Sequence, residues 1–141
     1  AQSSILRRMT AIHTLCFMTF IALWATATPH AIDELGLRVS SAALVGLAGL
    51  FGGLATIAVA AFHGRVGAAR SLVLSLAASL VGVGVIAAAP DSLAATVCGL
   101  LLLSAGMSSE QVTTQAVGLA SVPPEQGGRA NTVYMGSTFL G

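Results

Sequence analysis

Long apolar stretches without ionic side chains alternate with short charged segments along this sequence. Asp, Glu, Lys and Arg are absent from residues 9–32, 39–64 and 71–90. A helix rises about 1.5 Å per residue and needs about 20 apolar residues to cross a bilayer, so each stretch is long enough for one crossing. A fourth stretch, from about Leu93 to Val122, is long enough only if Glu110 lies within the membrane.

We therefore predict helical crossings at residues 9–29, 41–62, 71–89 and 93–121, and the start of a fifth at residue 130. Only helices and closed barrels satisfy their backbone hydrogen bonds in hydrocarbon, and barrel strands alternate apolar and polar residues. The run of residues 42–61 does not alternate. The pattern thus predicts an all-α integral membrane protein whose successive helices are antiparallel neighbours.

The arginines predict how the helices are oriented. Five of them fall on one side of the predicted crossings, and only Arg38 falls on the other. Positive residues favour the cytoplasmic side of a membrane protein. The arginines that we expect in the cytoplasm are Arg7, Arg8, Arg65, Arg70 and Arg129.

Composition supports a lipid environment and excludes other classes. Hydrophobic residues make up 55% of the 141 residues and charged residues 8%, against about 25% charged in soluble domains. A net charge of +1 without a basic run argues against nucleic acid as a partner. Cys16 and Cys98 lie in apolar stretches, where a thiol packs as a small hydrophobe, so we expect no metal and no cofactor. The chain begins with Ala1 and stops within an apolar run at Gly141, and we interpret it as an internal fragment.

Two predicted crossings carry faces of small residues. Ser75, Ser79 and Gly82 share one side of the third crossing, and Gly46, Gly49 and Gly53 share one side of the second. Such faces allow close approach of helix backbones in lipid. We interpret both as packing surfaces; for the glycines of the second crossing, a sliding helix in a transporter is the alternative.

The first crossing places one histidine and several aromatic rings on one face by the helical period. These are His13, Phe17, Phe20 and Trp24. Two interpretations stay open at this point: His13 and Trp24 contact a substrate in a cavity, or His13 lies at the headgroup level and Trp24 near the outer interface.

The fourth crossing is polar in its second half. Ser104, Ser108, Gln111 and Gln115 follow one another at helical spacing, which predicts a stripe that lines an aqueous cavity. Glu110 lies about one turn past the middle of this crossing. A carboxylate at that depth is a functional candidate; the alternatives are a salt bridge to an arginine outside the fragment, or snorkelling toward the cytoplasm.

Two loops resemble those of the major facilitator superfamily, in its bacterial drug and sugar efflux branch. Residues 123–131 (PPEQGGRAN), with the following TVYM and the final FLG, look like the loop before the eleventh helix and that helix's start. Residues 63–70 (HGRVGAAR) resemble the cytoplasmic loop between helices eight and nine, although the loop's aspartate is replaced by Gly64. The resemblance implies helices seven to ten and the start of eleven of a twelve-helix fold, within the C-terminal six-helix bundle. It also implies a gating role for the loop residues Gly64, Arg65, Gly67 and Arg70.

The predicted function is secondary active transport by alternating access: proton-coupled efflux of a small organic compound across the cell inner (plasma) membrane. The expected partners are the lipid bilayer, the small-molecule substrate, protons and the missing N-terminal bundle. Candidate cavity residues are His13, Trp24, Ser104, Ser108, Glu110, Gln111, Gln115, Asn131 and Tyr134. A structural membrane subunit is one alternative. An integral membrane enzyme is less favoured, because the histidines lie near helix ends or in loops and Glu110 is expected to stand alone.

Overall fold

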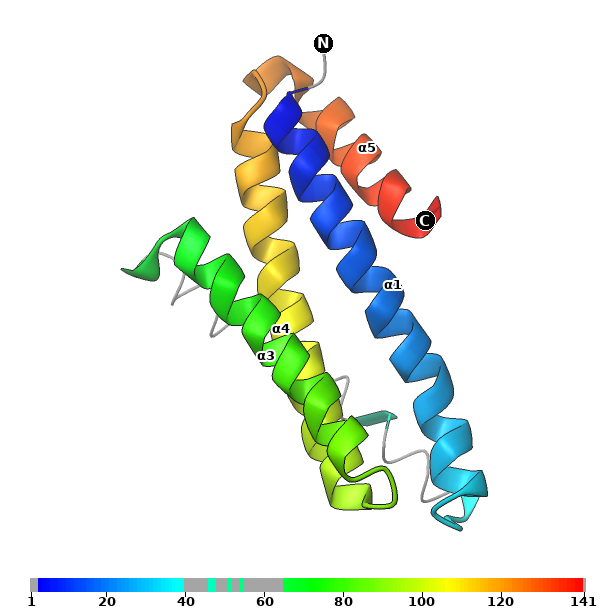
Figure 1. Cartoon of the computed structure of the whole chain (residues 1–141). Helices are drawn as coiled ribbons and strands as arrows, with labels where there is room; N and C mark the ends of the chain where they lie inside the picture. The colour runs from blue at the N-terminus through cyan, green and yellow to red at the C-terminus, as the bar shows by residue number, and fades with distance from the viewer. Residues whose placement is uncertain (1–2, 40–45, 48–50, 52–53, 55–64, 141) are drawn as a thin grey trace.

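The computed structural model describes residues 3–39, 46–47, 51, 54 and 65–140. The helices are α1 (Ser4–Asp33), α3 (Ala68–Ala88), α4 (Leu93–Ala120) and α5 (Gly127–Leu140), and a short 3₁₀ helix, η1 (Pro124–Gln126), precedes α5. Figure 1 shows α4 at the centre, with α3 crossing it on one side and α1 and α5 on the other. The predicted second crossing lies outside the described residues, apart from four helical positions, Gly46, Leu47, Phe51 and Leu54.

The described part of the chain is helical and contains no strand. Three of its helices, α1, α3 and α4, are long and apolar enough to cross a membrane, with mean hydropathies of 1.5, 2.2 and 1.4. The prediction of an all-α membrane fold is therefore confirmed. α3 and α4 lie within one to three residues of the predicted crossings, and α5 begins three residues before position 130.

α1 is longer than the crossing predicted at residues 9–29, and it continues through Pro29 to Asp33. Proline cannot donate a backbone hydrogen bond, but near a helix end few turns remain to be distorted. Beyond it, the Glu34 N–H still bonds to the His30 carbonyl at 2.9 Å. The His30 ring also bonds through Nε2 to the Pro90 carbonyl at 2.8 Å, which ties this end of α1 to the turn between α3 and α4.

α3 and α4 form a hairpin whose helices meet almost backbone to backbone. Ser92 begins α4, and its hydroxyl accepts a hydrogen bond from the Ala95 N–H at 3.3 Å. A methyl group placed on Gly82 would lie 2.6 Å from the Gly99 carbonyl oxygen and 2.8 Å from the Leu103 amide nitrogen. Such contacts are possible only with glycine, so the expectation that the small residues of the third crossing form a packing face is confirmed.

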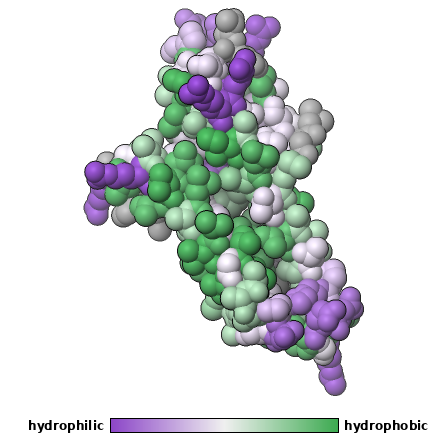
Figure 2. All heavy atoms as spheres, in the orientation of Figure 1, coloured by the Kyte–Doolittle hydropathy of each residue, from purple (hydrophilic) through white to green (hydrophobic). Residues whose placement is uncertain are grey.

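The bundle is polar inside and apolar outside. One small apolar cluster, formed by Ala27, Ala31, Leu100 and Leu103, packs α1 against α4. Most other buried residues of α4 are glycines or carry a hydroxyl group. In contrast, large apolar side chains such as Leu80 and Phe139 are 73% and 75% exposed. Figure 2 shows this as an apolar belt between hydrophilic ends, with a further hydrophilic group where α3 begins. Lipid solvates such an exterior, so the exposed apolar side chains need no protein cover.

The Gly82 contact can be tested with a matched pair of variants on one helix. We expect Gly82→Ala to lower the free energy of unfolding by about 1–3 kcal/mol, because the added methyl group must push the α4 backbone away. Gly84→Ala should be neutral or stabilising, since a methyl group at that position would meet no described atom within 4 Å and alanine favours helix. Thermal unfolding of the full-length protein in detergent measures both. Equal effects of the two substitutions would contradict the close α3–α4 contact.

Candidate functional site

A buried hydrogen bond between an acid and a base joins α1 to α4. His13 Nδ1 lies 2.9 Å from Glu110 Oε2, and the two side chains are 0% and 1% exposed. His13 is nine positions after the start of α1, and Glu110 is ten positions before the end of α4. Because the two helices run in opposite directions with these ends on the same side, the two residues reach the same depth of the bundle. The pair lies about 14 Å from those ends along the helices.

Tyr134 of α5 covers the histidine. Its ring stacks on the His13 ring with the two centroids 5.0 Å apart and the planes 8° from parallel, and the side chain is fully buried. The Tyr134 and Thr114 hydroxyls are 2.6 Å apart. Thr114 in turn donates its single hydroxyl hydrogen to the Glu110 carbonyl at 2.9 Å, so Tyr134 is the donor toward Thr114. Three helices thus meet at one acid–base pair.

The structure corrects three expectations for His13 and Glu110. Glu110 does not stand alone, because His13 lies within hydrogen-bond distance. The buried side chain of Glu110 does not snorkel, whereas a salt bridge to an arginine outside the fragment stays a prediction. His13 itself is enclosed by the bundle instead of lying among lipid headgroups. The sequence did not contain this signal, because the crossing predicted at residues 9–29 places His13 much closer to the membrane face than Glu110. The two depths match only because α1 begins at Ser4.

The pair has unused hydrogen-bonding capacity. Glu110 Oε1 and His13 Nε2 are buried, and neither has a hydrogen-bond partner within the described residues. A carboxylate and an imidazole at 2.9 Å share one proton readily, since the proton can be assigned to either partner without changing the total charge. Removing that proton would leave one uncompensated negative charge in a low-dielectric interior, which is unfavourable by several kcal/mol. The arrangement is therefore suited to holding and exchanging a proton.

The aromatic face of α1 is partly buried against the other helices. The Phe17 ring meets Phe139 of α5 edge to face, with centroids 5.6 Å apart, and Phe20 lies next to Trp24 at 6.1 Å. Trp24 packs against the small apolar cluster, and its buried Nε1–H has no hydrogen-bond partner within the described residues. Its assignment as a substrate contact stays a prediction.

The polar stripe of α4 is split between two environments. Ser104 is buried, and its hydroxyl is unpartnered in the described part of the chain, whereas Ser108 and Gln111 are partly exposed. Gln115 Nε2 donates to Asn131 Oδ1 of α5 at 2.8 Å. The Gln111 carbonyl lies 3.4 Å from the Tyr134 hydroxyl. A role for this stripe in lining a cavity stays a prediction, but two of its amide residues contact the helix that carries Tyr134.

The predicted gating loop is described only in part. Gly64 lies outside the described residues. Arg65 and Arg70 are exposed near the start of α3, and Gly67 precedes α3 with φ of 79°, a conformation that favours glycine. No group of three or more metal-ligating side chains occurs among the residues that the structure describes.

The comparisons with known proteins identify the family of the chain. The family model of the Major Facilitator Superfamily matches residues 1–141. Searches of curated proteins and of solved structures returned no match. The family match spans every described helix, including the three that are able to cross a membrane. The chain therefore belongs to the Major Facilitator Superfamily and is a multi-pass membrane protein of a transporter family.

Proposed function

We propose that this chain belongs to a proton-coupled secondary transporter that exports a small organic compound across the inner (plasma) membrane. The observation that carries the proposal is the buried His13–Glu110 pair, to which α5 is joined through Tyr134. Family membership supports transport in general, and the resemblance of residues 123–131 to loops of efflux permeases supports the direction. The partners in this proposal are the bilayer, the substrate, protons and an N-terminal bundle.

The pair offers a physical route from proton binding to helix movement. With one shared proton, the pair is neutral overall and holds α1 and α4 together. A second proton gives the site a net positive charge, and loss of the shared proton gives a negative charge. Either charge is unfavourable in a dry interior and is relieved when water reaches the site. Proton loading thereby favours one arrangement of α1, α4 and α5 over another. Alternating access requires such a difference in free energy between two arrangements.

The loop before α3 completes the proposed cycle. Arg65 and Arg70 are exposed at the beginning of α3, and we assign them to contacts with the N-terminal bundle when the cytoplasmic side is closed. Gly67 lies immediately before α3 with a positive φ of 79°. In this proposal the loop stabilises the closed state, while the His13–Glu110 pair determines when that state forms.

Neutralising the carboxyl group tests proton coupling. We expect Glu110→Gln to abolish substrate transport driven by an imposed pH gradient, at least about tenfold below the parent, while exchange of substrate down its own gradient persists. Full-length protein in proteoliposomes, screened with labelled drugs and sugars, provides the measurement. Glu34→Gln, which changes an exposed carboxylate at the end of α1, is the control. Gradient-independent flux in the parent protein would contradict the coupling.

A double-mutant cycle tests the buried pair itself. His13→Leu or Glu110→Met alone should destabilise the protein by about 3–5 kcal/mol, since each leaves the other group buried and unpaired. The double variant should be more stable than either single variant, because both polar groups are then gone. Thermal unfolding of the four proteins gives the coupling free energy. Additive effects would mean that the two side chains do not interact.

Tyr134 can be dissected with two substitutions. Tyr134→Phe keeps the ring on His13 and removes the bond to Thr114, so we expect a loss of about 1 kcal/mol in stability with coupling retained. Tyr134→Leu removes the ring as well, and should lower stability by a further ~1 kcal/mol and weaken pH-driven transport. If both variants keep full pH-driven transport, α5 is not coupled to the pair through this residue.

A further inference from the structure

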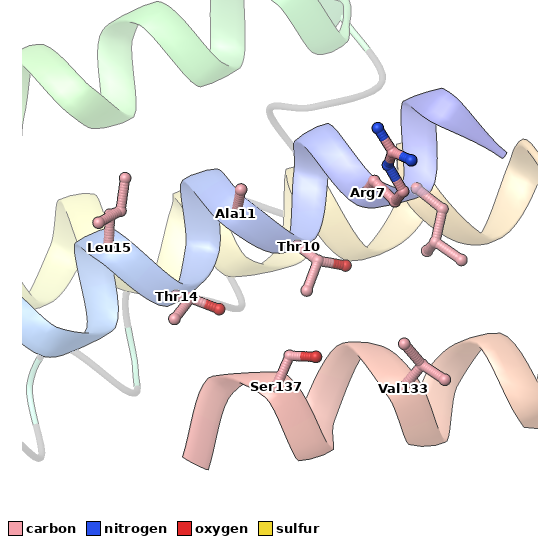
Figure 3. Close-up of a pocket in the computed structure, with 8 residues that line it drawn as sticks. Arg7, Thr10, Ala11, Thr14, Leu15, Val133 and Ser137 are labelled. Carbon is pink, nitrogen blue, oxygen red and sulfur yellow. The ribbon is translucent and has the colours of Figure 1, made fainter. Parts of the chain in front are cut away.

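A groove of about 490 Å³ lies between α1 and α5, apart from the His13–Glu110 pair. Drug-sized ligands typically occupy sites of about 300–1,000 Å³. Figure 3 shows Thr10 and Thr14 of α1 and Ser137 and Val133 of α5 around the space that separates the two helices. The lining residues are Leu6, Arg7, Thr10, Ala11, Thr14, Leu15, Val133 and Ser137.

The polar groups of this groove are hydroxyls and one cation. Thr10 and Thr14 lie one turn apart on α1, and Ser137 provides a third hydroxyl from α5. Thr10 is only 9% exposed, and its hydroxyl has no hydrogen-bond partner within the described residues. Figure 3 shows its side chain directed toward the α5 side of the groove. A buried hydroxyl without a partner is unfavourable, so a ligand that accepts its hydrogen bond would relieve that penalty.

Arg7 gives the groove its charge. It lies one turn before Thr10, is exposed, and is not in an ion pair with any carboxylate of the described residues. Among the residues that the structure describes, no acidic side chain lines the groove. An arginine next to hydroxyl donors is suited to a carboxylate, sulfonate or phosphate group, and it would repel a cation. The remaining walls, Ala11, Leu15 and Val133, are apolar.

We propose that the groove between α1 and α5 binds an amphipathic organic anion. Its acidic group accepts hydrogen bonds from Arg7 and Thr10, and its apolar body lies along Leu15 and Val133. The inference rests on the proposed function, because it names the substrate class of the same transporter. A free organic acid and an anionic lipid headgroup share this chemistry, and the experiment separates them.

The test uses two dyes that differ by one acidic group, anilinonaphthalene sulfonate and its sulfonate-free parent phenylnaphthylamine. Fluorescence titration is carried out on the full-length protein in phosphatidylcholine nanodiscs, with empty nanodiscs subtracted. We expect saturable binding of the sulfonate, weakened about tenfold by Arg7→Gln and about fivefold by Thr10→Val. Binding of phenylnaphthylamine should not respond to either substitution.

Matched control variants distinguish a specific loss of dye binding from misfolding of the protein. Arg8→Gln removes a neighbouring exposed arginine that does not line the groove, and it should leave binding of the sulfonate unchanged. Thr10→Ser keeps a hydroxyl at this position and should therefore bind the sulfonate like the parent protein. Binding is measured without any gradient, whereas proton coupling is measured as transport driven by a pH gradient, so the two proposals fail separately. The proposal is overturned if Arg7→Gln and Thr10→Val bind the sulfonate like the parent protein, or if Arg8→Gln weakens binding equally.

Anionic lipid in the nanodisc identifies the natural source of the anion. If phosphatidylglycerol competes with the dye in the parent protein but not in Arg7→Gln, the groove holds a lipid headgroup. If it does not compete while the Arg7 and Thr10 effects persist, the groove takes a free organic anion. Either result supports an anion site. Dye binding that is not saturable in either lipid refutes it.

Discussion

The free energy of one carboxyl group in a low-dielectric interior constrains the whole helix arrangement. Glu110 is enclosed by three helices, and an isolated carboxylate there would be unfavourable by several kcal/mol. His13 removes most of that penalty only when α1 and α4 lie antiparallel at the observed register. The ring of Tyr134 then closes the site from α5. Register, depth and helix order are therefore tied to the protonation state of a single pair.

Around this pair the bundle reverses the usual distribution of polarity. Hydroxyls and glycines line the α3–α4 seam, where Ser75 bonds to Ser109, and large apolar side chains face outward. In lipid no hydrophobic force draws helices together, so close backbone contact and interhelical hydrogen bonds provide the association. α3 and α4 are held by close packing along their length, whereas α5 is attached to α4 through the Tyr134–Thr114 and Gln115–Asn131 bonds. In the proposed transport cycle, this polar attachment of α5 is the one that protons and water modify.

The fold followed from the sequence because charge spacing is a strong signal in membrane proteins. Absence of ionic residues over about 20 positions predicted α1, α3 and α4 to within a few residues, since hydrocarbon leaves the backbone no alternative to a helix. The small face of α3 was likewise predictable from Ser75, Ser79 and Gly82. The ends of the helices were less predictable from the sequence. α1 continues through Pro29, because a proline near a helix terminus disturbs few backbone hydrogen bonds.

The site was predicted only in part. Glu110, His13 and Tyr134 were each identified as candidates, but periodicity describes one helix at a time and does not say which faces meet. The pairing of Glu110 with His13 and the bond from Tyr134 to Thr114 depend on interhelical register, which a hydropathy pattern does not contain. The Thr10 hydroxyl was not recognised, because a lone threonine near a helix end is common. Depth matching across antiparallel helices pairs positions 13 and 110 only with the observed start of α1 at Ser4, because the crossing predicted at residues 9–29 places His13 nearer the membrane face than Glu110.

The depth of Glu110 also has an electrical consequence. The residue lies three to four positions beyond the centre of α4, about 5 Å toward the arginine-rich face. In hydrocarbon about 30 Å thick, a charge moving from that face to the carboxyl group crosses about a third of the membrane. A resting potential of about 100 mV then contributes roughly 0.8 kcal/mol to its occupancy. In the proton-coupled cycle proposed above, the voltage across the bilayer, and not only the acidity on either side, therefore helps to set how often this pair holds an additional proton.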